Sequence, residues 1–127
     1  MDISSLVSLT SEVEKINGEK VLLIHFSGKI TSDNIMEINQ KIKHLFENAI
    51  YNVILNISEL HYLNSTGIAM LLTIAKTIEQ NNGNLVMTRP SAFVRDLLDM
   101  TDLLSRFTIR ENIEQARESL KSKLEAV

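Results

Sequence analysis

The sequence predicts a single α/β domain over residues 1–127, with a mostly parallel sheet of about five strands, an N-terminal hairpin and about four helices. Three observations support this fold class. The pair Asn17-Gly18 joins two strand-like segments, as in a two-residue β-hairpin. The run 53–57 is mostly apolar and rich in β-branched residues, which is typical of a strand buried on both faces. After the hairpin, strand-like and helix-like segments alternate, as in parallel sheets covered by helices.

The predicted hairpin occupies the start of the chain, with strands over 11–16 and 20–26. The first strand alternates polar and apolar residues, so Val13 and Ile16 should flank an edge that faces solvent. The second strand is mostly apolar and should lie inside the sheet, and Gly28 is expected to end it.

A first helix should follow this hairpin. Capping residues cluster at 31–34, and apolar residues then recur at helical spacing, which is typical of a helix that starts near residue 35. The apolar residues that define its buried face are Ile35, Ile38, Ile42, Leu45 and Phe46.

The stretch 51–70 organises the rest of the chain. Its run 53–57 predicts the central strand, and the polar segment 58–62 predicts a turn. From residue 68 the apolar residues follow helical spacing, which predicts a helix with one buried face. That face consists of Ile68, Leu71, Leu72, Ala75 and Ile78. The segment 64–67 therefore lies where a strand passes into a helix.

The last third of the chain continues the alternation of strands and helices. A short strand is expected at 85–87, followed by a helix that carries Pro90 in its first turn, where proline is tolerated. Its buried stripe should be Phe93, Leu97 and Met100. A strand at 106–109 and a helix at 112–124 complete the predicted fold. Core residues expected across the domain are Ile24, Ile54, Leu55, Leu71, Leu72 and Leu97.

The junction at 64–67 suits an anion. The first amides of a helix lack intrahelical partners and carry the positive end of its dipole, so a phosphate there finds donors and a favourable field. Ser65 is a hydroxyl well placed to carry such a phosphate. Asn64, Ser65 and Thr66 are also good N-cap residues, so helix capping alone is the simpler alternative.

Around this junction, Asn64-Ser65-Thr66-Gly67-Ile68 follows the strand end Leu55-Asn56-Ile57-Ser58 and the pair Tyr62-Leu63. This arrangement resembles the signature of the STAS domain, the fold of bacterial anti-sigma factor antagonists. The resemblance extends over residues 7–116. The further segments that resemble the family's next strand, third helix and leucine pair are 83–87, 94–98 and 101–104.

The resemblance implies a regulator of transcription that works by partner switching. In that role the unphosphorylated protein binds an anti-sigma factor that is itself a serine kinase, and thereby frees a sigma factor. The kinase phosphorylates Ser65, which ends the binding, and a separate serine phosphatase restores the hydroxyl. Two departures concern recognition: Asn64 stands where the family commonly has Asp, and Lys29-Ile30-Thr31 stands where many members have Glu-Leu-Asp.

The partner-binding face should lie at one end of the sheet, because parallel strands place their following loops together there. The segments 28–33, 63–67 and 88–91 are expected to form this surface, with Ser65 near its middle. Its named residues are Asn64, Thr66, Gly67, Ile68, Gly28, Thr31, Ser32 and Arg89. At Gly67 a side chain is expected to crowd the partner while stability stays nearly unchanged.

Two other functions stay open. The first is a STAS module that binds without being phosphorylated, as a signalling scaffold or an accessory subunit of a transporter. The second, more remote, is a small serine-dependent enzyme. Leu63 stands where the hydrolase motif Gly-x-Ser-x-Gly needs its first glycine, and His61 has only Glu59 nearby to orient it. We therefore expect no catalytic residues and no enzyme activity.

Composition restricts the partners. The formal net charge of −3 offers no broad basic patch for nucleic acid. The chain has no cysteine, its histidines lack ligand spacing, and it has no phosphate-cradling glycine loop, so no disulfide, metal or cofactor is expected. The sequence shows neither a basic signal-peptide start nor an apolar run of membrane-spanning length, so we expect a cytoplasmic protein that does not insert into membranes.

Overall fold

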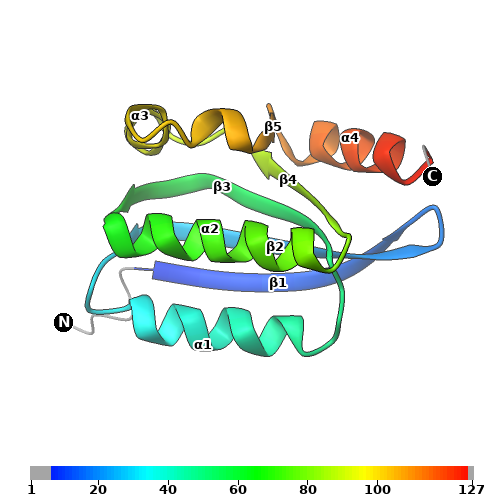
Figure 1. The fold of residues 1–127 in the computed structure, drawn as a ribbon, viewed down its shortest axis with the longest axis horizontal. Helices are drawn as coiled ribbons and strands as arrows, with labels where there is room; N and C mark the ends of the chain where they lie inside the picture. Colours follow the sequence, from blue (N-terminus) through cyan, green and yellow to red (C-terminus); the bar gives the residue numbers. More distant parts are fainter. Residues whose placement is uncertain (1–6, 126–127) are drawn as a thin grey trace.

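The computed structural model describes residues 7–125, which form a five-stranded sheet covered by helices (Figure 1). The strands follow one another in the sheet in the order β1-β2-β3-β4-β5. The first pair is antiparallel and the other three pairs are parallel. The bounds of the strands are β1 Val7–Ile16, β2 Glu19–Ile30, β3 Asn52–Leu63, β4 Asn84–Thr88 and β5 Thr108–Arg110.

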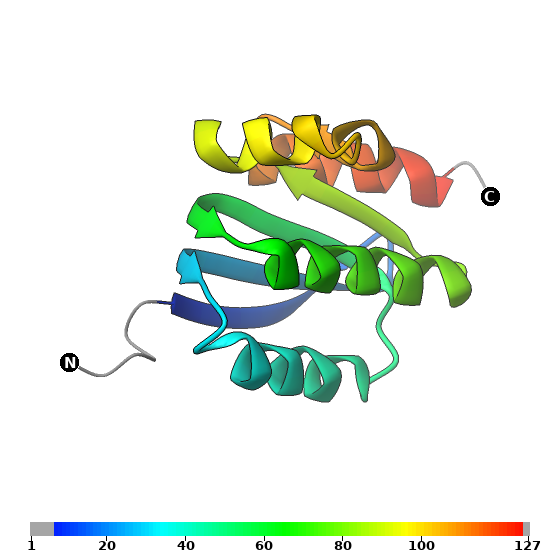
Figure 2. The same cartoon turned by 60° about the vertical axis from the view of Figure 1, so that its left-hand side comes forward.

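The helices cover the two faces of the sheet unequally. In Figures 1 and 2, α2 crosses in front of the strands and α1 lies beside it, below β1, while Figure 2 shows α4 behind α3. The bounds of the helices are α1 Ile35–Phe46, α2 Ser65–Gln80, α3 Ala92–Met100 and α4 Ile113–Glu125, with a short 3-10 helix at Leu104–Arg106. The predicted fold class is confirmed. None of the helices within 7–125 is long and apolar enough to cross a membrane.

Each face of the sheet carries its own hydrophobic cluster. The larger one joins the sheet to α1, α2 and α3, and the smaller one joins it to α4 through Ala116 and Leu120. Of the expected core residues, those on the strands and Leu71 are almost fully buried. Leu72 and Leu97 are only half-buried and pack against the larger cluster from outside, so their placement in the core was wrong.

The N-terminal hairpin forms at the predicted turn. Asn17 and Gly18 have φ angles of 53° and 81°, the left-handed values that a tight two-residue turn requires. β1 is an edge strand, and Val13 is 54% exposed on it. Gly28 does not end β2, as expected from the sequence, because the strand continues through it, at a φ of 91°, to Ile30.

The segment 58–62, predicted as a turn, is the second half of β3. The register with β2 shifts twice here, and at each shift β3 carries one more residue than its partner. Such bulges break the alternation of inward and outward side chains, so Leu60 and Leu63 are both buried although they are an odd number of positions apart. Because a simple two-residue period is lost, the sequence pattern suggests a turn where the strand continues.

β4 is shorter than β3, and side chains satisfy part of the β3 backbone where β4 ends. The Ile57 amide donates to Thr88 Oγ1 at 3.0 Å, and Ser91 Oγ donates to the Leu60 carbonyl at 2.8 Å. Ser91 is the N-cap residue of α3, so Pro90 precedes the helix and does not occupy its first turn as predicted.

The buried faces of two helices are rotated from their predicted positions. On α2 the buried side chains are Met70, Leu71, Ile74 and Ile78. On α3 the buried residues are Val94 and Leu98, whereas Phe93 and Met100, predicted as part of the buried stripe, are 49% and 81% exposed. α3 therefore presents to solvent some of the side chains that the sequence places in the core.

Candidate functional site

The junction between β3 and α2 is held by Asn64. Its backbone is extended, with φ −102° and ψ −170°, and it is the N-cap residue of α2. The side-chain oxygen Oδ1 accepts hydrogen bonds from the Gly67 amide at 3.1 Å and from Thr66 Oγ1 at 2.6 Å. One of the orphan donors of the helix start is thereby satisfied, which confirms the predicted cap.

Ser65 is the first residue of α2 and its side chain is exposed. None of the hydrogen bonds between residues of the described chain involves its hydroxyl, although both of its neighbours take part in the cap. The positive end of the α2 dipole lies at this point, so a phosphate on Ser65 Oγ meets a favourable field. Chemically, the arrangement offers the Ser65 hydroxyl, which no other residue of 7–125 engages, on a helix start that Asn64 already stabilises.

Gly67 faces the interior, contrary to its predicted place on the binding surface. It is buried, and a Cβ atom there would lie 2.9 Å from Leu63 Cβ and 3.3 Å from Ile30 Cγ2. The absent side chain therefore lets α2 approach the ends of β2 and β3 closely. Ile68 is half-buried and packs against the larger cluster, so it contributes to the site only in part.

The loop between β2 and α1 lies beside this junction, because Ile30 pairs with Leu63 in the sheet. Of the site residues predicted there, Ser32 is exposed, and Thr31 and Gly28 are half-buried. The structure thus brings the first two of the three predicted loop segments together at one end of the sheet, where α1 and α2 begin (Figure 1).

Arg89 lies apart from Ser65. Arg89 follows β4, which ends at Thr88. The Thr88 hydroxyl donates a 2.9 Å hydrogen bond to the side chain of Asn56, so β4 ends level with that residue of β3. β3 continues for seven more residues, to Leu63. The Arg89 guanidinium forms an ion pair at 2.7 Å with Glu111, ahead of α4. The predicted single surface therefore does not include Arg89.

An aromatic pair at the same end of the sheet escaped the sequence analysis. Tyr62 of β3 and Phe93 of α3 stack with ring centroids 5.4 Å apart, and they are 37% and 49% exposed. Tyr62 is three residues from Ser65. The sequence signal that could have indicated this pair is the position of Tyr62 next to the junction, because the chain has only six Phe and Tyr residues.

The other candidate chemistry finds little support in the geometry. His61 is exposed and its Nε2 lies 3.8 Å from Glu59 Oε2, too far for a hydrogen bond. No hydrogen bond joins it to Ser65 among the interactions of residues 7–125. Within the same residues, no group of three or more His, Asp or Glu side chains is arranged to hold a metal ion.

The structure is a small α/β domain with a SpoIIAA-like fold, and the exposed Ser65 begins the helix at its β3–α2 junction. The sequence model of one family, the STAS domain, matches residues 6–116. The protein therefore belongs to the STAS domain family.

Two relatives in sequence are named as anti-sigma factor antagonists. BtrV of Bordetella bronchiseptica, named as an anti-sigma factor antagonist, is 26% identical over 112 residues, which cover 88% of this chain and 95% of BtrV. An anti-sigma-B factor antagonist of Staphylococcus epidermidis is 22% identical over 80% of this chain and 94% of its own length.

Solved structures show the same fold. The unphosphorylated form of the anti-sigma factor antagonist SpoIIAA superposes with a TM-score of 0.71 at 20% identity, covering 89% of this chain and 97% of SpoIIAA. The phosphorylated form of SpoIIAA from Bacillus gives a TM-score of 0.64 at 20% identity, covering 87% and 99% of the two chains.

Proposed function

We propose that this protein is an anti-sigma factor antagonist whose partner switch is the phosphorylation of Ser65. The observation that carries the proposal is the exposure of the Ser65 hydroxyl, which has no hydrogen bond to another residue of 7–125, at the N-terminus of a helix that is capped by its neighbour Asn64. Membership of the STAS family and the names of the relatives support it. The protein acts by binding, and no catalytic role is assigned to its own residues.

In its unphosphorylated state the protein binds an anti-sigma factor that is also a serine kinase, and the sigma factor is released. Ser65 Oγ attacks the γ-phosphorus of ATP held by the kinase, ADP leaves, and the hydroxyl proton passes to a base of the kinase. A separate serine phosphatase returns the phosphate to water. The chain itself needs no cofactor for either step.

The switch follows from charge at the helix start. Phosphate adds about −1.5 to −2 charges at neutral pH, which the α2 dipole tolerates because the charge sits at its positive end. The fold is therefore unaffected, whereas a partner that covers Ser65 must bury an unpaired anion. Asn64 is neutral, so the phosphate meets no like charge from this side chain.

The partner surface consists of the exposed helix start and what surrounds it. Ser65 and Thr66 form its centre, and Ser32 borders it from the loop before α1. The stacked Tyr62 and Phe93 supply aromatic area, which is the kind of side chain that most often dominates binding energy at an interface. Gly67 supports this surface from below and does not touch the partner.

The test compares two substitutions at Ser65. Ser65→Ala removes the acceptor and adds no charge, so it should keep the affinity for the anti-sigma partner and lose the mass increase of one phosphate after incubation with that kinase and ATP. Ser65→Asp places a charge in the interface and should weaken binding at least about tenfold, which corresponds to roughly 1.4 kcal/mol. Thr66→Ala serves as the control for phosphorylation at the neighbouring hydroxyl.

Three results would contradict the proposal. Equal affinities of the Ala and Asp variants, measured by calorimetry on folded protein, would favour a scaffold that binds without phosphorylation. A phosphate on the Ser65→Ala variant would move the acceptor elsewhere. Turnover of activated esters that is lost with Ser65→Ala would favour a serine-dependent enzyme.

A further inference from the structure

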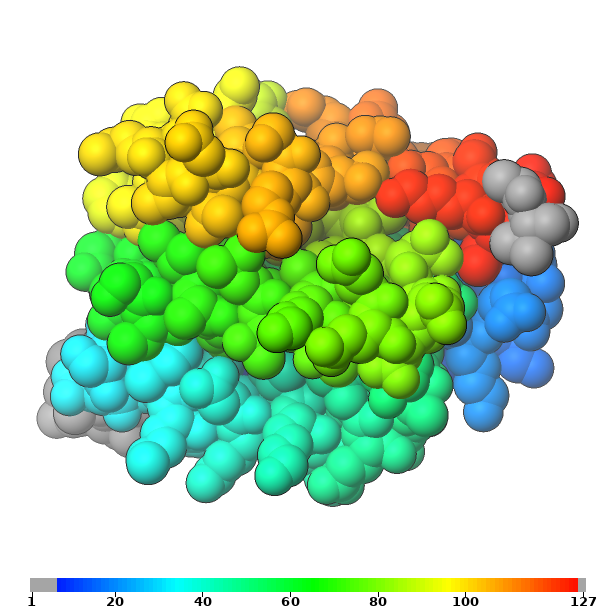
Figure 3. Space-filling view, in the orientation of Figure 1, coloured from blue at the N-terminus to red at the C-terminus, as the bar shows by residue number. Residues whose placement is uncertain are grey.

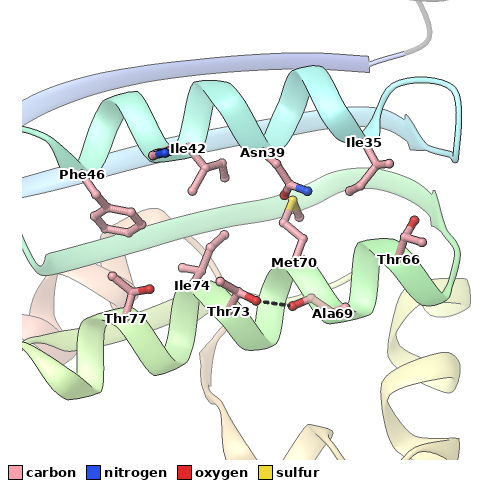
Figure 4. A pocket seen from close by; sticks show the side chains of 11 residues that line it. Ile35, Asn39, Ile42, Phe46, Thr66, Ala69, Met70, Thr73, Ile74 and Thr77 are labelled. Atoms are coloured by element: carbon pink, nitrogen blue, oxygen red, sulfur yellow. Dashed lines mark hydrogen bonds between the residues drawn. The ribbon is translucent and has the colours of Figure 1, made fainter.

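A groove runs between α1 and α2 on the face of the molecule shown in Figures 3 and 4. Its volume is about 560 Å³, within the range of small-molecule sites in proteins. The two helices run side by side for about three turns, from Ile35 and Thr66 at one end to Phe46 and Thr77 at the other (Figure 4). The groove therefore extends along most of the length of α1, and it lies beside the exposed start of α2.

The floor of the groove is apolar. Ile42, Met70 and Ile74 line it and are 7%, 4% and 1% exposed. Two hydroxyls on its wall are already engaged: Thr73 Oγ1 donates to the Ala69 carbonyl at 2.9 Å, and Thr66 Oγ1 donates to Asn64. Asn39 and Thr77 add two more polar side chains to the lining, but aliphatic and aromatic side chains make up most of the rest, so an occupant meets mainly hydrocarbon there.

One charge stands at the edge of this apolar groove. Lys43 is the single charged residue among the described side chains that line it. Its neighbours on α1 are paired, Lys41 with Glu37 at 3.6 Å and His44 with Glu47 at 3.1 Å, whereas no ion pair between described residues involves Lys43. An occupant with an anionic group would complete this arrangement.

We propose that the groove binds a single-chain amphiphile with a carboxylate head group, held by Lys43, and an alkyl tail along Ile42, Met70 and Ile74. From Lys43 to Ile35 the helix spans eight residues, or about 12 Å. An extended alkyl chain rises about 1.3 Å per carbon, given a C–C bond of about 1.5 Å, so a tail of about nine carbons fills this length. Decanoate matches the site. The inference does not rest on the proposed role of Ser65.

The experiment is calorimetric titration of the full chain with hexanoate, octanoate and decanoate below their micelle concentrations. One saturable site is expected, with the affinity rising about fourfold for each added methylene, since each buried methylene contributes about 0.8 kcal/mol. Decyltrimethylammonium has a similar tail and the opposite charge, so it should bind at least about tenfold more weakly than decanoate.

Matched variants locate the site. Lys43→Gln should weaken decanoate about three- to tenfold without weakening decyltrimethylammonium, whereas Lys41→Gln, on the same helix but outside the groove, should change neither. Ala69→Phe places a ring in the groove and should abolish binding. Gln80→Phe adds the same ring on α2 outside the groove and should leave decanoate binding intact. Ala69 and Gln80 are both exposed, so these variants should remain folded.

The outcomes are decisive in both directions. Binding that does not saturate, equal affinity for the two head-group charges, or decanoate binding that survives Ala69→Phe would overturn the proposal. Unfolding of Ala69→Phe, seen by circular dichroism, would shift the decision to the Lys43→Gln and Lys41→Gln pair. Ser65→Ala should bind decanoate as the wild type does, so a failure here is distinct from a failure of the phosphorylation switch.

Discussion

The junction between β2 and α1 and the junction between β3 and α2 use the same residue type in different ways. Both helices have an asparagine as N-cap residue, Asn34 for α1 and Asn64 for α2. The Asn34 side chain is buried and bonds back to its own loop, donating to the Lys29 carbonyl and accepting from the Thr31 amide, each at 2.9 Å. The Asn64 side chain is half-buried and bonds forward, to the Gly67 amide.

The residue after each asparagine shows what this difference means. Ile35 begins α1 and packs against the core, whereas Ser65 begins α2 and points into solvent. The Asn34 side chain forms hydrogen bonds within the preceding loop and thereby fixes its conformation. The Asn64 side chain caps α2, and the next side chain, that of Ser65, stays exposed. The first junction therefore stabilises the fold, and the second is available to a partner.

The sharpest way to test this comparison is to replace each asparagine by aspartate. Asn34→Asp removes the donor to Lys29 and places a carboxylate in a buried site, so it should lower the free energy of unfolding by about 2–4 kcal/mol. Asn64→Asp keeps the accepting oxygen and adds a negative charge at the start of α2. This variant should therefore raise the free energy of unfolding by about 0.3–1 kcal/mol. Urea unfolding of both variants measures these changes in the free energy of unfolding. Changes of the same sign would contradict the proposed difference between the two junctions.

Gly67 should show the next largest effect. Its Cβ position is too close to Leu63 and Ile30 for an alanine to fit without a shift, so Gly67→Ala should destabilise the protein by about 1–3 kcal/mol. Ser65→Ala is the control in the same helical turn and should stay within about 0.5 kcal/mol of the wild type. A Gly67→Ala variant as stable as wild type would show that α2 can move away from the sheet.

Removing the forward cap should cost less. Asn64→Ala deletes the acceptor for the Gly67 amide, so it should lower the free energy of unfolding by about 1 kcal/mol and speed hydrogen exchange of that amide. Thr66→Val removes only the second donor to the same oxygen and should have a smaller effect. If both variants exchange the Gly67 amide at the wild-type rate, the cap does not hold this turn.

Ser65→Asp should have the smallest effect on stability. The added charge lies at the positive end of the α2 dipole and contacts no buried group, so the free energy of unfolding should rise by about 0.3–1 kcal/mol or stay unchanged. Thermal unfolding at low and high salt measures this, because salt should reduce any gain. A marked loss of stability would show that Ser65 contributes to the fold.

The parts of the fold that depend on local pattern could be predicted from the sequence. The turn at Asn17-Gly18 requires only two residues that accept a left-handed backbone, and the cap at Asn64 requires only a side chain that reaches its own helix. The position of Ser65 at a helix start followed from the same local reasoning. These features need no knowledge of what packs against them.

The parts that depend on distant residues could not be predicted in this way. The bulges in β3 arise from its register with β2, so the polar residues after Ile57 look like a turn in the sequence alone. Gly67 has a packing role only because Leu63 and Ile30 lie against it. Phe93 is apolar at a helical position, yet it stacks on Tyr62 outside the core.

The order of the strands has a consequence for how the chain acquires its structure during synthesis. In the described part of the chain, each strand after β1 pairs with the strand that precedes it, and none is inserted between two earlier ones. The hairpin of β1 and β2 needs only local contacts, which form fast. A nascent chain that leaves the ribosome can therefore add β3, β4 and β5 in turn to an edge that is already in place, with no pairing delayed until a later segment arrives.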